Sequence, residues 1–79
     1  MRDFIASQKT GRNVASIQWE NKREGKILRD VRGEPQIGTV RDNKVYDLDG
    51  NFLGHLQKGR VVGPDGSMPP AFAVLIGEP

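Results

Sequence analysis

A short pattern of hydrophobic and small residues occurs four times along the chain, each time after a glycine. In every copy an aliphatic or aromatic residue is followed by a small residue, any residue and an aliphatic residue. The glycines are Gly11, Gly33, Gly50 and Gly66, and the segments are Val14–Ile17, Ile37–Val40, Leu53–Leu56 and Phe72–Leu75. No longer window keeps a helical spacing of apolar residues, so the pattern predicts short strands joined by turns.

These strands are expected to form four hairpins. The clearest unit runs from Lys44 to Leu56, where Asp49 and Gly50 separate two apolar runs, a strong signal for a tight hairpin. In the second unit an extra residue beside Pro35 predicts a bulge, because proline cannot donate to a strand ladder. We therefore expect one all-β domain over residues 1–79, with about eight short antiparallel strands in four hairpin repeats around a pseudo-four-fold axis. The units cover roughly residues 4–19, 26–40, 44–56 and 60–76.

The recurring small residue predicts close packing. Ala15, Gly38, Gly54 and Ala73 hold the small position of the four copies. Side chains alternate between the faces of a strand, so each small residue shares a face with the aliphatic residue two positions later. Glycine or alanine at one position in every copy indicates that backbones or large side chains approach each other there.

The string from Lys44 to Leu56, with its weaker copies, resembles the four-fold β-flower domain, a family of small bacterial proteins. That resemblance implies a compact all-β fold with four petal-like hairpins, and it implies no activity. The segment from Val45 to Gly54 is also similar to the start of a PRC-barrel domain. PRC barrels are small adaptors in photosynthetic reaction centres and in ribosome maturation, but this second resemblance explains one unit and not four.

Length and composition limit the class of protein. A chain of 79 residues with 35% hydrophobic residues can form one domain with a thin core. The absence of cysteine excludes disulfides and thiolate metal sites. No stretch approaches the roughly 20 apolar residues that span a bilayer. We therefore expect a soluble, cytoplasmic protein.

The charge is unevenly distributed. The net charge is +2, but residues 1–32 hold eight Lys or Arg against four Asp or Glu, whereas residues 33–79 hold four against six. A basic half can attract nucleic acid, although solvated outer faces of strands explain the same charges. The residues expected to contact nucleic acid in that case are Arg12, Trp19, Lys22, Arg23, Lys26, Arg29 and Arg32. The charged link Glu20–Glu24 is expected to be the most mobile segment.

The last predicted strand, Phe72–Ile76, is apolar on both faces. If one face joins the core, the other needs a cover, because an exposed apolar edge favours association. This pattern predicts self-association through Phe72, Val74 and Ile76. Most of the five aromatic residues are expected to pack in the core. Trp19 is the exception, since beside Arg and Lys it could stack a base instead.

Residues with catalytic or metal-binding chemistry are few. His55 is the one histidine, predicted on a solvent-facing strand position. Asp47, Asp49 and Asn51 match part of a calcium loop, but the late bidentate carboxylate is missing, so a turn explains them better. We expect no catalytic, cofactor or metal site. The sequence favours a non-catalytic binding or assembly module, with nucleic-acid binding through the basic half as the alternative.

Overall fold

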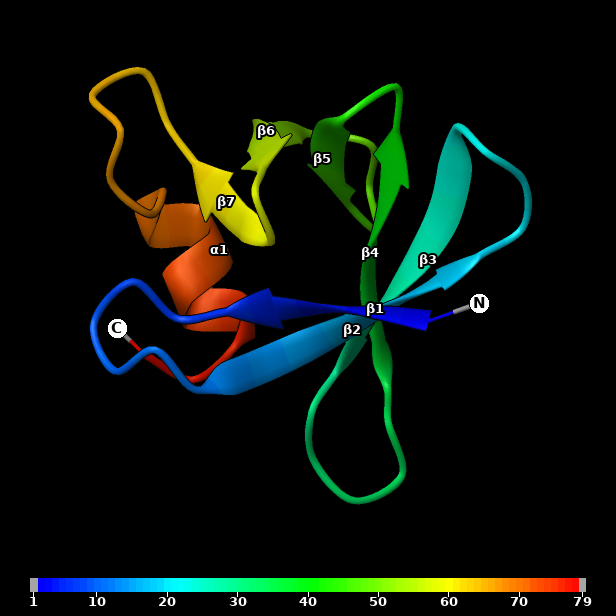
Figure 1. Cartoon of the computed structure of the whole chain (residues 1–79), viewed down its shortest axis with the longest axis horizontal. Helices are drawn as coiled ribbons and strands as arrows, with labels where there is room; N and C mark the ends of the chain where they lie inside the picture. Colours follow the sequence, from blue (N-terminus) through cyan, green and yellow to red (C-terminus); the bar gives the residue numbers. More distant parts are fainter. Residues whose placement is uncertain (1, 79) are drawn as a thin grey trace.

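The computed structural model describes residues 2–78 and consists of one curved antiparallel sheet and one short helix (Figure 1). The elements are β1 (Arg2–Ala6), β2 (Asn13–Trp19), β3 (Glu24–Arg29), β4 (Gln36–Arg41), β5 (Lys44–Asp47), β6 (Phe52–Gln57), β7 (Arg60–Val62) and α1 (Pro70–Leu75). The seven strands pair strictly in chain order. The sheet coils until its ends approach, and the Ala6 amide donates to the Gly59 carbonyl at 2.8 Å. The all-β prediction is confirmed, as a nearly closed barrel.

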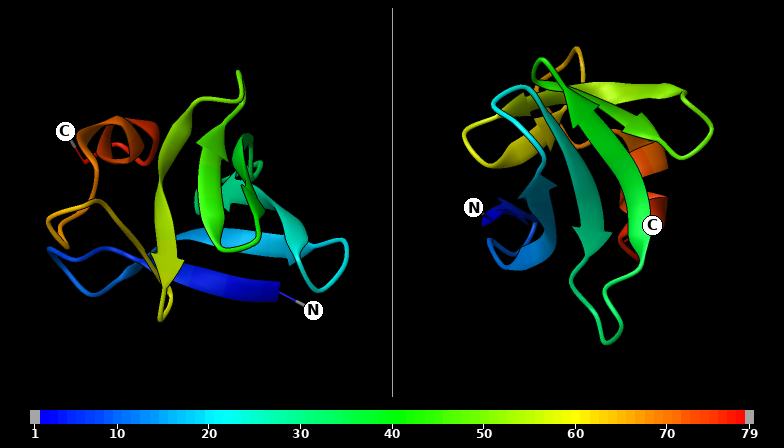
Figure 2. Two further views of the ribbon diagram at one scale, coloured as in Figure 1. Left: turned by 90° about the horizontal axis from the view of Figure 1, so that it is seen from above. Right: turned by 90° about the vertical axis from the view of Figure 1, so that its right-hand side faces the viewer.

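Three of the predicted hairpins share one irregularity. In β1–β2 the register shifts so that Ile5 pairs with Ala15 while Ala6 pairs with Asn13. The same shift recurs in β3–β4 and β5–β6, where it leaves Ile37 and Leu53 without a partner in the register. A bulge of this kind bends the strand and increases its twist. The repeated aliphatic–small pair is therefore the bulge itself, and three such bends curl the sheet into a barrel (Figure 2).

The turn predictions are confirmed with one exception. The four glycines at the hairpin turns have φ between 73° and 87°, in the left-handed region that favours glycine. Asn43 and Gly59, in the short turns between hairpins, also have positive φ. Gly25 was expected to play the same part, but it lies inside β3 opposite Trp19 and is buried. An added Cβ there would lie 2.8 Å from Ile17, so packing explains this glycine.

Every unit contributes buried side chains to the core of the barrel. Ile5, Ile27, Val45 and Val61 occupy equivalent places on the first strand of each unit, and all four are fully buried. In the first three units these residues pair with the small residue of the repeat. The pairs are Ile5 with Ala15, Ile27 with Gly38, and Val45 with Gly54. A Cβ at Gly54 would lie 2.6 Å from the Val62 carbonyl oxygen and 2.9 Å from Pro69, which supports the predicted close approach.

The fourth unit departs from the prediction. Residues 72–76 were expected to form its returning strand, but α1 begins at Pro70 and takes their place. Proline has no N–H for a strand ladder, and its fixed φ suits the first turn of a helix. The Phe72 and Ala73 amides both donate to the Pro69 carbonyl at 3.0 Å. The sheet therefore has seven strands, and the helix lies between β7 and the β1–β2 turn (Figure 1).

Helix α1 completes the core. A helix of six residues is unstable alone, so packing must hold it in place. Phe72 and Ile76, one helical turn apart, are both buried in the barrel core. The chain then returns to the start of the sheet, where the Ser7 hydroxyl donates to the Glu78 carboxylate at 2.7 Å. No helix in the part of the chain described here is long and apolar enough to cross a membrane.

Candidate functional site

The seven residues expected to contact nucleic acid do not form one surface. Arg12 lies in the β1–β2 turn and Arg32 in the β3–β4 turn, whereas Lys22 and Arg23 lie in the β2–β3 turn. Strand β2 separates Arg12 from Lys22, and a strand rises about 3.3 Å per residue. The basic half is therefore spread over several turns instead of being concentrated on one face.

The Trp19 side chain is held in place by contacts within the protein. Its indole nitrogen donates to the Asp3 carboxylate at 2.7 Å, and the ring is half-buried against the core. The shallow hollow beside it is lined by Asp3 and Glu20 as well as Lys22. Two carboxylates next to one lysine make this place a poor match for a phosphate chain.

Lys26, Arg29 and Arg23 complete the set. Lys26 is exposed on β3, opposite Thr39, which is in turn opposite Tyr46. Arg29 is half-buried, and its guanidinium lies against the backbone of Gly77 near the end of the chain. Arg23 forms an ion pair with Asp42, with 3.5 Å between Nε and Oδ1. Both side chains of that pair are largely exposed, so the pair adds little to stability.

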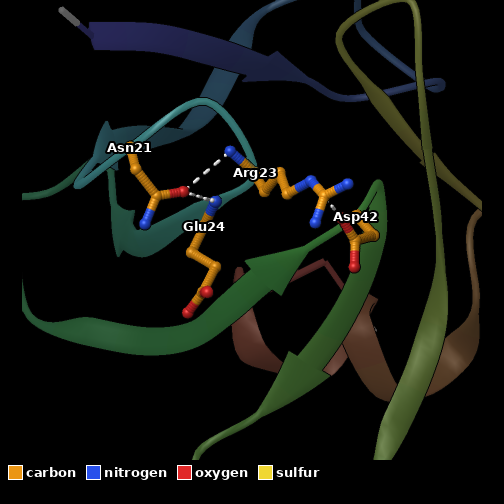
Figure 3. Close-up of polar contacts among 4 residues, drawn as sticks. All are labelled: Asn21, Arg23, Glu24 and Asp42. Carbon is orange, nitrogen blue, oxygen red and sulfur yellow. Dashed lines mark hydrogen bonds and ion pairs between the residues drawn. The ribbon is translucent and has the colours of Figure 1, made fainter.

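The Glu20–Glu24 link is organised by hydrogen bonds. The Asn21 side-chain oxygen accepts from the backbone amides of Arg23 and Glu24 at 2.8 and 2.9 Å, as Figure 3 shows. The Arg23 carbonyl in turn accepts from the Asp42 amide of the next turn. These contacts tie two neighbouring turns together, and the high mobility expected for the link stays a prediction.

The residues expected to mediate self-association are not on a common surface. Phe72 and Ile76 were assigned with Val74 to the uncovered face of a strand, but in the helix they point into the core and are 1% and 6% exposed. Val74 points the other way and is 65% exposed. The helical period of 3.6 residues separates side chains that a strand would place together. Of these three residues, Val74 is the one that remains exposed for an apolar contact.

The carboxylates of the hairpin turns stabilise those turns. Asp47 accepts from the amides of Asp49 and Asn51 through one oxygen, and from the Asn51 side chain through the other. The hydrogen bond from the Asn51 side chain is the main cause that lowers the pKa of Asp47. The pKa of Asp65 is lowered in the same way, chiefly by the Ser67 hydroxyl. These bonds agree with the prediction that turn formation explains the aspartates.

Asp47→Asn is expected to make stability less sensitive to acid. The folded pKa of Asp47 lies below its unfolded value, so the carboxylate stabilises the fold fully above about pH 4. That stabilisation disappears as the pH falls through the lower folded pKa. Thermal unfolding followed by circular dichroism between about pH 2 and 7 would measure it. Asp49→Asn makes the same charge change in the same turn but leaves the Asp47 carboxylate and its three hydrogen bonds in place, so it is the control for the loss of one charge. Equal acid dependence in the parent and Asp47→Asn would contradict this account.

A surface that the sequence did not predict lies on the outside of β4 to β7. Strand pairing places Tyr46 beside Phe52 and, in the next row, Lys44 beside His55. Arg41 pairs with Lys44 in that second row. We call this surface the β4–β7 face. Its members are Arg41, Lys44, Tyr46, Phe52, His55 and Arg60.

Three rings of the β4–β7 face form a continuous row. The ring centroids of Tyr46 and Phe52 are 5.9 Å apart, and those of Phe52 and His55 are 5.3 Å apart, both edge to face. Phe52 is 52% exposed and His55 is exposed, as predicted for the histidine. Phe52 does not follow the expectation that most aromatic residues pack in the core, because the bulge at Leu53 places it on the outer face.

The β4–β7 face also borders a hollow of about 470 Å³. Its lining includes Tyr46, Thr39 and Arg41 together with Glu20 and Glu24. Glu24 is directly opposite Arg41 in the register of β3 and β4. Along β4 to β7 the charged side chains on the outer face are Arg41, Lys44 and Arg60. Asp47 pairs with Gly38, on the opposite face from Tyr46. The strands therefore present basic side chains and aromatic rings together.

One sequence signal could have located this face. Tyr46 directly follows the buried Val45, and His55 directly follows the buried Gly54. Because side chains alternate along a strand, both residues are assigned to the outer face. Aligning them across the hairpin needs the bulge, because a one-residue shift moves every side chain to the other face. The comparisons with protein-family models, curated proteins and solved structures found nothing similar to this chain.

Proposed function

We propose that this protein is a non-catalytic binding module that recognises its partner through the β4–β7 face. The observation that carries the proposal is the row of Tyr46, Phe52 and His55, in which Phe52 and His55 are exposed and Tyr46 is partly buried. A chain with a thin core gains most by burying its large rings. Phe52 is instead half exposed on a rigid hairpin, which favours a role in contact with another molecule.

The scaffold suits such a role. The rings are on strands, not on loops, and strand pairing fixes their spacing before any partner arrives. A preorganised surface loses little conformational freedom on binding. The carboxylates with lowered pKa values, Asp47 and Asp65, are engaged in their own turns, so their perturbation has a structural cause.

Site-specific photo-crosslinking in cells would test the proposal. Benzoylphenylalanine at position 52 should form discrete adducts with a partner, whereas the same residue at position 4 should form few. Position 4 is a matched control, since Phe4 is 49% exposed on strand β1 and lies outside the β4–β7 face. Equal adduct yields at the two positions, or none at position 52, would contradict the proposal.

A further inference from the structure

We infer that the β4–β7 face binds single-stranded nucleic acid, with bases stacked on its rings and phosphates held by its basic residues. This inference rests on the proposed function, because it names the ligand of the same surface. It differs from the sequence-based expectation, which assigned nucleic-acid contact to residues of the N-terminal half. The members of the face come from β4 to β7 only.

The rings supply the first part of a single-strand site. Proteins that bind single strands without strong sequence preference stack successive bases on aromatic side chains above a rigid sheet. Phe52 stands between Tyr46 and His55, and half of its surface is open to solvent. A duplex keeps its bases stacked on each other, so a row of rings on the surface of a strand pair favours an unpaired nucleic-acid strand.

The basic residues supply the second part. Lys44 and Arg41 lie beside each other across β4 and β5, and Lys44 is directly opposite His55. Arg60 lies on the same outer face, on the far side of β6. Within residues 2–78 none of these three side chains forms an ion pair, so their charge is available to a polyanion. Phosphates spaced along a strand complement cations that flank a row of rings.

The acidic residues set the limit of the site. Glu20 and Glu24 line the hollow next to Tyr46 and Arg41, on the β2–β3 side. They repel phosphates there, and Glu24 is directly opposite Arg41 in the register of β3 and β4. The backbone of the nucleic acid is therefore expected to follow Lys44 and Arg60, with Arg41 at the edge of the site. A nucleic-acid strand is disfavoured at the β2–β3 turn as well. Lys22 and Arg23 lie near carboxylates there, and these carboxylates also repel phosphates.

Fluorescence anisotropy with labelled single strands of roughly 10 nucleotides, in RNA and DNA form, would test the inference. The parent chain should bind both single strands more tightly than a duplex of the same sequence. Phe52→Ala should weaken binding about 5- to 150-fold, as expected for the loss of one base stack. Phe4→Ala removes an equally exposed ring outside the face and should leave affinity unchanged. Phe52→Tyr keeps a ring and should keep most of the affinity.

Salt titration would test the basic residues. With three phosphate contacts, the logarithm of the binding constant should fall with the logarithm of salt concentration with a slope of about −2. Lys44→Gln should reduce the size of that slope by about 0.7, whereas Lys22→Gln should leave it unchanged. Circular dichroism would verify that each variant is folded.

Several results would overturn the inference. They are absence of binding at low salt, equal losses in Phe52→Ala and Phe4→Ala, tighter binding of the duplex, or a larger effect of Lys22→Gln than of Lys44→Gln. If the single strands fail to bind while position 52 still crosslinks to a protein, the nucleic-acid inference is wrong and the binding module stands. If both fail, the proposed function is wrong as well.

Discussion

Phe72→Ala is expected to lower the free energy of unfolding by about 3–5 kcal/mol, the range typical of removing a fully buried phenylalanine. Phe72 is 1% exposed and is the largest fully buried side chain of the barrel. It comes from a helix that has too few residues to be stable alone, so the loss of this ring also loosens α1. Urea unfolding followed by far-ultraviolet circular dichroism would measure the change.

Val74→Ala is the matched control for that experiment. It removes apolar atoms from the same helix, but Val74 is 65% exposed, so stability should change by no more than about 0.5 kcal/mol. Because a domain of this size has little stability to lose, Phe72→Leu provides a milder variant with a smaller expected loss. If Phe72 and Val74 were equally sensitive to alanine, the segment would be packing as the strand expected from sequence, and the helix would be wrong.

Gly54→Val should destabilise the protein by about 1–3 kcal/mol through overpacking. Gly54 lies opposite Val45 in the β5–β6 hairpin. Its missing side chain leaves room for the Val62 carbonyl and for Pro69, which leads into α1. A valine would push apart β6, β7 and the start of the helix at once. Thermal unfolding and urea titration would both detect the loss.

Gln57→Val controls for strand propensity in that comparison. Gln57 is exposed on the same strand, and valine favours strands, so this change should be neutral or slightly stabilising. A Gly54→Val variant as stable as the parent chain would show that the small position of the repeat has no packing role.

The sequence was sufficient to predict the hairpins because local chemistry specifies them. The turn glycines adopt the left-handed conformation that few other residues tolerate, and Asp47 and Asp65 stabilise the turns next to Gly50 and Gly66. The alternation of apolar residues placed Ile17, Val40 and Leu56 on the side of the barrel core. These features depend on neighbours in the chain, so they can be predicted without tertiary contacts.

The last unit could not be predicted from its repeat pattern. Phe72–Leu75 has the same succession of large, small and aliphatic residues as the strands of the other units. Pro69 and Pro70 decide the outcome, because they withhold two amides from any ladder with β7. An apolar run of five residues fits a short strand or a buried helix equally well by periodicity alone.

The candidate site was missed because it depends on register. Counting charges along the chain drew attention to residues 1–32, but the fold distributes those cations among three turns and the strands β1 and β3. Arg41, Lys44 and Arg60 come from the less basic half and meet only through strand pairing. Phe52 looked like a core residue until the bulge at Leu53 placed it outside. A surface formed by residues of several strands cannot be predicted from one segment at a time, because it depends on which residues pair across the strands.

Amide chemical-shift mapping by NMR during titration with a single-stranded oligonucleotide would test the central claim most directly. Perturbations should concentrate on β4 to β7, at Arg41, Lys44, Tyr46, Phe52, His55 and Arg60. The amides of Lys22, Arg23 and Arg32 should change little. Perturbations centred on those three turn residues, or none at a high excess of oligonucleotide, would contradict it.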